Sequence, residues 1–253
     1  HLAVRTSFSL LESMITTKGL TKWCTDHGMP AVAVTDRNNL FGALELSESL
    51  SGAGIQPIMA VCFDVTDGAH QETITRLSLY AQNKQGYERL MALSSYAYLD
   101  AEDGVPRINK SYLESETDGL IVLTGGAEGD VARLLLKGKT DEAKAALETL
   151  AANFPGRCYV EITRHGSPEE AQCEPGLLAL AYELGLPIVA THDARFMQPS
   201  DASAHDAMMC IANGAYLGQE DRPQVQGEQY LKTEADMRAL FADLPEAIET
   251  TAE

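Results

Sequence analysis

The sequence has no long apolar run and no excess of basic residues. No uninterrupted apolar stretch approaches the roughly 18 residues that a membrane-spanning helix needs. Lysine and arginine number 19 against 37 aspartate and glutamate residues, which gives a formal charge of -18. Because binding to a phosphate backbone is driven largely by counterion release to basic side chains, we expect any contact with DNA to be indirect or confined to a small patch.

The cysteines show no pairing pattern. The five cysteines are an odd number with no C-x-x-C spacing, which argues against a disulfide framework and a structural zinc site: Cys24, Cys62, Cys158, Cys173 and Cys210. The first 30 residues contain no basic segment followed by an apolar run and a cleavage site, as a secretory signal would. A reducing cytoplasm is the expected location.

Several catalytic motifs are also absent. The chain has no G-x-x-x-x-G-K-[ST] loop for nucleotide phosphates, no G-x-S-x-G nucleophile elbow and no H-E-x-x-H metal helix. No D-x-D stretch occurs either, although nucleotidyl transfer requires clustered aspartates for two metal ions. Template-directed polymerisation is therefore not expected from these residues.

The length and composition indicate one domain. With 253 residues, of which 45% are hydrophobic, the chain can bury a sizeable core. No linker or internal repeat divides the chain. Only residues 100–110 and 218–228 are candidates for a change in composition between two parts of it.

Short apolar runs alternate with helical patterns along the chain. Apolar, β-branched runs predict strands at 31–35, 55–65, 73–81, 119–123, 158–162 and 187–190. Apolar residues at helical spacing predict helices at 40–53, 84–98, 141–154, 168–184 and 201–212. This alternation favours parallel pairing in a βα barrel or a doubly wound sheet, whose active sites lie at the carboxyl ends of the strands.

Two N-terminal motifs resemble a known family. The opening H-L-A-V-R-T-S-F-S-L-L and the stretch G-M-P-A-V-A-V-T-D-R-N-N-L-F-G at 28–42 resemble the N-terminal PHP (polymerase and histidinol phosphatase) domain of bacterial replicative DNA polymerase III alpha subunits. Further ordered matches lie at 54–58, 82–87, 160–165, 190–195, 201–205 and 240–247. The resemblance covers essentially the whole chain.

The resemblance implies a fold and a domain plan. Members of this family form a distorted (βα)7 barrel related to the TIM barrel, with up to three metal ions held by His and carboxylate groups at the strand ends. We expect a single PHP domain over 1–253, with the barrel at about 1–215. Residues from about 216 to 253 would form a C-terminal extension leading towards polymerase domains.

Most positions that match the family's metal ligands carry other residues. The opening H-x-H motif is represented by Ala3 and Arg5, and the T-D-H-G-N motif becomes T-D-R-N-N, with Asp36 retained and Arg37 in place of histidine. Cys62 replaces a carboxylate, while Arg76 and Arg195 replace histidines. Only Asp36, His165 and Asp193 remain as plausible ligands, so we expect no resident metal, or at most weakly bound Mn, Zn or Mg.

The four arginines suggest a replacement for the metal ions. Buried carboxylates that lose their metal need another positive charge, and guanidinium groups can bind carboxylates through two hydrogen bonds. One hypothesis is therefore that Arg5, Arg37, Arg76 and Arg195 form a salt-bridge network with Asp36, Asp193 and perhaps Glu161. The alternatives are an anion pocket for phosphate or a DNA end, and unrelated surface arginines.

Three other features have mainly structural interpretations. The turn Thr124-Gly125-Gly126 could cradle a phosphate at a helix start, although two glycines more often form a plain turn. His192 and His205 are expected to pack or hydrogen-bond rather than to catalyse. Cys62 could be a soft ligand, but an inert buried thiol is the usual state of such a cysteine.

The resemblance implies a part of a DNA-directed DNA polymerase, a nucleotidyltransferase of DNA replication, without its polymerase site. We expect no catalytic residue, a structural role, and docking of the separate proofreading exonuclease subunit. The partners would be that subunit and the remaining polymerase domains. The alternatives are a metal-dependent phosphoesterase or 3′–5′ exonuclease that retains activity through Asp36, His165 and Asp193, and a free-standing binding module.

Overall fold

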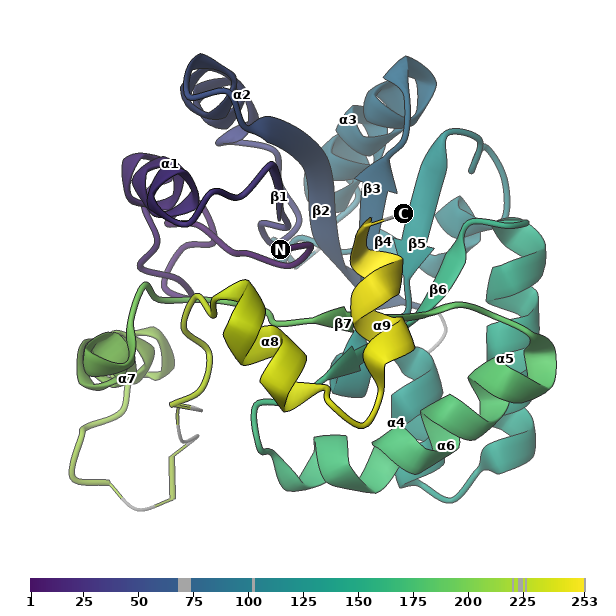
Figure 1. The fold of residues 1–253 in the computed structure, drawn as a ribbon. Coiled ribbons are helices and arrows are strands. Elements are labelled where there is room, and N and C mark those ends of the chain that lie inside the picture. The colour runs from purple at the N-terminus through teal and green to yellow at the C-terminus, as the bar shows by residue number, and fades with distance from the viewer. Residues whose placement is uncertain (68–73, 102, 220, 223–224, 226, 253) are drawn as a thin grey trace.

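One curled sheet forms the centre of the molecule (Figure 1). The computed structural model describes residues 1–67, 74–101, 103–219, 221–222, 225 and 227–252. The strands run in the order β1-β2-β3-β5-β6-β7, and the short strand β4 pairs with β2 outside this path. Their bounds are β1 Ala31–Val34, β2 Gln56–Thr66, β3 Thr75–Ala81, β4 Ile108–Asn109, β5 Leu120–Leu123, β6 Cys158–Thr163 and β7 Ile188–Thr191.

The N-terminal residues join the two edges of this sheet. The carbonyl oxygens of His1 and Val4 accept hydrogen bonds from the amides of Ala33, in β1, and Thr35, directly after it. Val4 also forms a parallel bridge with Ala194, three residues after β7. The first residues therefore bridge the gap between β1 and the segment after β7, and the predicted distorted barrel is confirmed.

The prediction of parallel pairing is wrong for one strand. β3 runs antiparallel to both β2 and β5, whereas the other pairs are parallel. A parallel pair needs a crossover connection, usually a helix, and no helix was predicted between residues 65 and 73. Residue 73, the start of the predicted strand, and parts of the composition breaks at 100–110 and 218–228 lie outside the described residues.

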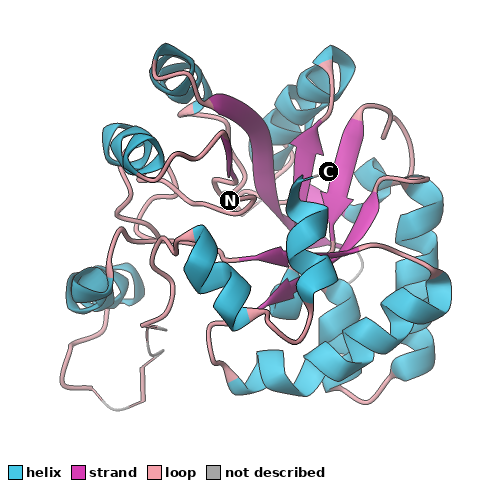
Figure 2. Cartoon of the chain, viewed as in Figure 1, coloured by secondary structure: helices cyan, strands magenta, loops and turns pink. Residues whose placement is uncertain are grey.

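Helices lie around the outside of the strands (Figure 2). The five predicted helices correspond to α2, α3, α5, α6 and α7. Of these, α2 begins three residues later than predicted. Four described helices, α1, α4, α8 and α9, were not predicted. The bounds are α1 Thr17–Asp26, α2 Ala43–Gly52, α3 Lys84–Leu99, α4 Asp130–Leu136, α5 Thr140–Asn153, α6 Pro168–Leu184, α7 Ala202–Asn213, α8 Glu234–Leu240 and α9 Pro245–Glu249.

The largest core cluster connects the sheet to the helices. It contains Phe63 and Val122 from the strands, Leu147 from α5 and Leu177 from α6. Phe241 and Ile248 belong to the same cluster, so the α8–α9 segment packs on the barrel. In the described part of the chain, no helix is both long and apolar enough to cross a membrane.

Candidate functional site

A cavity of about 430 Å³ lies at the end of the barrel where the predicted site residues gather. Seven of the nine predicted positions line it: Ala3, Arg5, Cys62, Arg76, His165, Asp193 and Arg195. Asp36 and Arg37 lie beside it, at the carboxyl end of β1. The structure therefore brings the predicted residues together, including ones that are nearly 200 positions apart in the sequence.

Strand direction explains how Arg76 reaches this cavity. Arg76 is the second residue of β3, and β3 runs antiparallel to β2 with Asp64 directly opposite Arg76. The amino end of β3 therefore lies at the same end of the barrel as the carboxyl ends of β1, β6 and β7. Gly125 fits closely here, because a Cβ atom at this position would lie 1.9 Å from the carbonyl oxygen of Arg76.

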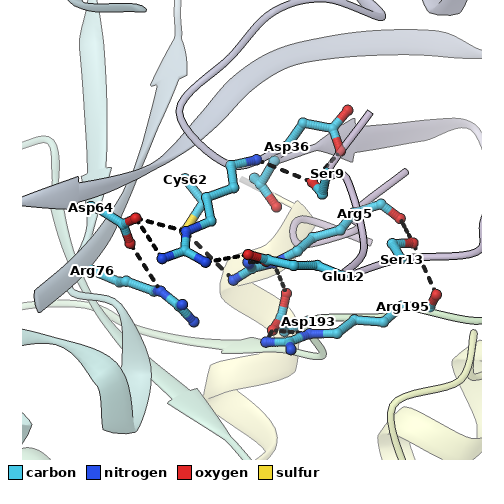
Figure 3. A network of polar contacts seen from close by, with 12 residues as sticks. Arg5, Ser9, Glu12, Ser13, Asp36, Cys62, Asp64, Arg76, Asp193 and Arg195 are labelled. Carbon is cyan, nitrogen blue, oxygen red and sulfur yellow. Dashed lines mark hydrogen bonds and ion pairs between the residues drawn. The ribbon is translucent and has the colours of Figure 1, made fainter. Parts of the chain in front are cut away.

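Arg5 is the most buried of the four arginines, with 3% of its side chain exposed. Its Nε donates to Asp193 Oδ1 at 2.7 Å, and its Nη1 donates to Glu12 Oε2 at 2.6 Å. Glu12 also accepts a hydrogen bond from Arg37 Nη1 through its other oxygen. One carboxylate from the loop before α1 thus joins two arginines from different strand ends (Figure 3).

Asp64 joins the next pair of arginines. Its Oδ2 accepts from Arg37 Nε at 2.7 Å, and its Oδ1 accepts from Arg76 Nε at 3.1 Å. Arg76 continues the chain of contacts through Nη1, which donates to both Glu128 oxygens at 2.5 and 2.6 Å. Glu128 is half-exposed, so this end of the chain of ion pairs reaches solvent.

Asp193 joins Arg5 to the fourth arginine. Its Oδ2 accepts from Arg195 Nη2 at 2.6 Å and from Arg195 Nε at 3.0 Å, while Oδ1 is bonded to Arg5. We call the four arginines and the four carboxylates that they bind the arginine network: Arg5, Arg37, Arg76, Arg195, Glu12, Asp64, Glu128 and Asp193. Four positive and four negative charges make it formally neutral.

The network changes the ionisation of its buried members. Burial raises the pKa of Asp193, but the Arg195 and Arg5 guanidinium groups outweigh burial and hold the pKa far below its usual range. The pKa of Glu12 is lowered in the same way, since Arg5 and Arg37 outweigh burial. Ion pairing also raises the pKa of Arg5 well above its usual value despite burial. These groups therefore stay charged at neutral pH.

The expectation for Asp36 and Glu161 is corrected, because neither is hydrogen-bonded to an arginine. Asp36 accepts from the Thr6 amide at 2.7 Å and from the hydroxyls of Thr6 and Ser9, both at 2.6 Å. Glu161 accepts from the Thr191 hydroxyl at 2.6 Å and from the Gly125 amide at 3.0 Å. Burial raises the pKa of both carboxyl groups. Neutral donors thus satisfy these two groups.

The histidines have hydrogen-bonding roles. His165 Nδ1 lies 2.7 Å from Glu170 Oε1, whereas its buried Nε2 has no hydrogen-bond partner. Its ring lies 4.8 Å from that of His192, whose Nε2 donates to the Glu228 carbonyl oxygen at 2.6 Å. Burial lowers the pKa of His192 to about 3. His205, on α7, is hydrogen-bonded to the carbonyl oxygen of Glu12 at 2.8 Å.

Two other candidates fit structural roles. Cys62 is buried, and burial raises the pKa of its thiol to about 11, so the sulfur is not ionised at neutral pH. The Gly125 amide, which would have to face a phosphate in a cradle at this turn, donates to Glu161 instead. An inert thiol and a packing turn describe these positions better than a soft ligand and a phosphate cradle.

The donor set does not fit a metal ion. Both Asp193 oxygens are bound by guanidinium groups, and the Asp36 oxygens accept three hydrogen bonds. Arginine cannot lose its proton at ordinary pH and repels a divalent cation at short range. Within the described ranges, no group of three His, Cys, Asp or Glu side chains has a geometry suited to a metal.

Sequence reasoning missed three of the four carboxylates in the network. Asp64 could have been found, because residues two apart on a strand point to the same face and Asp64 follows Cys62 by two positions. Glu128 follows the Gly125-Gly126 turn, and Glu12 lies in the loop after the first motif. No periodic sequence pattern indicates either residue, because Glu12 lies in a loop and Glu128 ends a 3-10 helix of three residues, Gly126–Glu128.

Comparison with known proteins identifies the family. Residues 1–165, more than half of the chain, match the family model described as "PHP domain". The chain is 45% identical to the DNA polymerase III subunit alpha of Caulobacter vibrioides over 99% of its length, and 36% identical to that of Escherichia coli (strain K12) over 100%. It spans only 22% of the length of these relatives.

Solved structures support the fold alone. An amidohydrolase from Chromobacterium violaceum, solved with bound sulfate and no metal, matches 77% of this chain and 86% of its own with a TM-score of 0.52 at 11% identity. A second similar structure is a two-domain protein from Bacteroides vulgatus, described as containing a predicted PHP-like metal-dependent phosphoesterase. The match covers 85% of this chain and 55% of that protein's chain, with a TM-score of 0.50 at 10% identity. Together with the match to the family model, the barrel shows that this chain belongs to the PHP domain family.

Proposed function

We propose that this chain is the PHP domain of a DNA polymerase III alpha subunit and that it has no phosphoesterase activity of its own. The observation that carries the proposal is the arginine network, in which guanidinium groups stand where the family's motifs place metal ligands and bind the carboxylate oxygens that remain. Metal-assisted hydrolysis needs an open coordination position and an activated water. In this proposal the fixed positive charges of the four guanidinium groups take the place of the metal ions.

The proposed role is structural, together with docking of the proofreading exonuclease subunit. The similarity to polymerase alpha subunits along the whole chain supports the remaining polymerase domains as partners. The residues from about 216 to 253 would lead towards those domains from a single PHP domain over 1–253. The charge of -18 favours protein partners and only indirect contact with DNA. The cytoplasm, where bacterial replication takes place, is the proposed location.

A metal titration tests the absence of activity. The chain, dialysed against a chelator, would be titrated with Mn²⁺, Zn²⁺ and Mg²⁺, its metal content measured by elemental analysis, and its activity assayed on a single-stranded DNA 3′ end. We expect no stoichiometric metal and no 3′–5′ hydrolysis. Stoichiometric metal with turnover that is lost in Asp193→Ala would overturn the proposal.

The same experiment evaluates the residual phosphoesterase alternative. One observation favours that alternative, namely that His165 lines the cavity and its Nε2 has no hydrogen-bond partner. If His165 is a ligand, His165→Gln abolishes metal-dependent hydrolysis. If the arginine network has replaced the metals, His165→Gln and the unmodified chain are equally inactive.

A further inference from the structure

The loop of residues 6–13 is held in place by the arginine network. Glu12 binds Arg5 and Arg37, and the Ser13 hydroxyl donates to the carbonyl oxygens of Arg5 and Arg195 at 2.7 and 2.9 Å. On the other side of the loop, the Ser9 hydroxyl donates to Asp36 at 2.6 Å. Both sides of the loop are therefore anchored to the site.

The tip of this anchored loop exposes two leucines. Leu10 is 76% exposed and Leu11 is 48% exposed. Leu11 also has a φ of 59°, in the left-handed region that a leucine rarely adopts. Such a conformation persists only where the surroundings hold it, and it commonly marks a functional segment. The loop thus presents apolar side chains in a fixed arrangement, which reduces the entropy lost on binding.

The apolar surface continues from the loop to α2 and α3. The Phe8 ring packs against Gly42, where a Cβ atom would lie 2.5 Å from it, and the Asn39 amide donates to the Phe8 carbonyl oxygen. The Phe41 ring lies 5.7 Å from the Tyr98 ring at the end of α3. We call the resulting surface the leucine face. It consists of six large apolar residues that are 43–79% exposed: Leu10, Leu11, Phe41, Leu44, Tyr98 and Leu99.

Acidic residues predominate around the leucine face, although Arg107 at its edge pairs with Asp103. Residues 6–16, 38–54 and 91–106, the segments that carry the face, include no lysine and no arginine. Four exposed acidic residues lie in these segments: Glu45, Glu48, Asp100 and Asp103. Exposed apolar groups of this extent mark interaction sites in soluble proteins. A complementary surface would carry apolar side chains with lysine or arginine at its rim.

We propose that the leucine face docks a separate protein through an amphipathic segment whose apolar side chains are flanked by lysine and arginine. This inference rests on the proposed docking function and names the surface and the chemistry of its partner. The arginine network then has a second consequence, because it holds Leu10 and Leu11 in the geometry that the partner binds.

Binding measurements with the proofreading exonuclease subunit test whether the leucine face is the docking surface. The protein would be the full-length alpha subunit that contains this chain, and the probe would be the exonuclease subunit of the same organism. We expect Leu10→Asp and Leu44→Asp to raise the Kd about tenfold or more, as loss of a central apolar contact does. Ile211→Asp is the matched control, because Ile211 is similarly exposed at 72% but lies on α7; we expect its Kd to equal that of the unmodified protein.

A charge comparison tests the chemistry of the partner. Leu44→Lys and Leu44→Glu remove the same apolar side chain but add opposite charges. We expect the lysine variant to bind more weakly than the glutamate variant, with a difference that shrinks as salt is added. Equal affinities, or weaker binding of the glutamate variant, would contradict a basic partner. Because Leu10 and Leu44 are exposed, thermal unfolding should show that these variants remain folded.

Crosslinking identifies the occupant directly. A photoreactive amino acid at position 44 of the alpha subunit, in the purified complex, should crosslink to the exonuclease subunit. A crosslink only to the alpha chain itself or to a second copy would overturn the proposal. Unchanged binding of the leucine variants would overturn the location but leave the docking function intact. No binding by the unmodified protein would overturn the docking function and this location with it.

Discussion

Two regions of the candidate site satisfy their buried polar groups in different ways. In the arginine network, Arg5 and Arg195 bind Asp193, and the pKa of that carboxyl is held far below its usual range. Around Glu161 and His192, the contacts are hydroxyl, amide and carbonyl groups. Burial raises the pKa of Glu161 and lowers that of His192. One region is therefore paired as ions and the other favours neutral groups.

This difference shows two ways in which a protein can satisfy buried carboxyl groups without a bound metal ion. Buried carboxylates without a cation are costly, and they persist either by gaining a permanent positive charge or by becoming protonated. The four arginines supply that positive charge to the carboxylates of the network. At Glu161, hydroxyl and amide donors satisfy the carboxyl group instead, and burial raises its pKa. We expect the two regions to respond differently to substitutions and to pH.

Removal of Arg5 should have the largest effect. Arg5→Met keeps much of the apolar stem but leaves Asp193 and Glu12 without one of their cations. We expect the free energy of unfolding to fall by about 3–5 kcal/mol, the usual cost of breaking a buried ion pair. Equilibrium urea unfolding measures this change. Arg238→Met is the control, because Arg238 forms an exposed pair with Glu234 whose loss should cost about 1 kcal/mol or less.

Removal of one shared charge should have a smaller effect. Asp64→Asn weakens the contacts of Arg37 and Arg76, but each arginine keeps a second carboxylate, Glu12 or Glu128. We expect a loss of about 1–3 kcal/mol in urea unfolding. The double variant with Arg76→Met should lose less than the sum of the two single changes, because both disrupt the same contact. Strict additivity would show that Asp64 and Arg76 act independently.

In the neutral region, His192 should make the free energy of unfolding depend on pH. Unfolded, His192 binds a proton near pH 6.5, but in the folded chain its pKa is about 3. Between these values the unfolded state holds more protons, so stability falls as pH falls, by up to about 1.4 kcal/mol per pH unit. His192→Gln can keep the hydrogen bond to Glu228 and should reduce this slope between pH 6.5 and 5. An unchanged slope would show that His192 is protonated in the folded chain.

The sequence was sufficient to predict the barrel and the positions of the four arginines, but not how the network is connected. Ordered motif matches placed Arg5, Arg37 and Arg195 at strand ends, and helical periodicity located α5 and α6 to within a residue or so. The antiparallel direction of β3 depends on sheet pairing, which local pattern does not specify. It is this direction that places Arg76 opposite Asp64.

The partners of the carboxylates were harder to predict for a physical reason. Asp36 and Glu161 were expected to bind arginines because charge complementarity favours it. The structure instead surrounds them with nearby hydroxyls and amides, such as those of Thr6 and Thr191. Which donor reaches a buried oxygen depends on the path of irregular loops, and residues 6–13 carry no periodic signal.

The most direct test replaces a carboxyl group by an amide in each region, with urea unfolding measured at pH 7.5. Asp193→Asn should lose about 2–4 kcal/mol, because the amide removes the charge that Arg5 and Arg195 bind and turns an N–H₂ towards their donors. Glu161→Gln should change stability by less than about 1 kcal/mol, because its amide can still accept from Gly125 and donate to Thr191. Equal losses in the two variants would contradict the distinction between an ion-paired and a neutral region, and with it the role proposed for the arginine network.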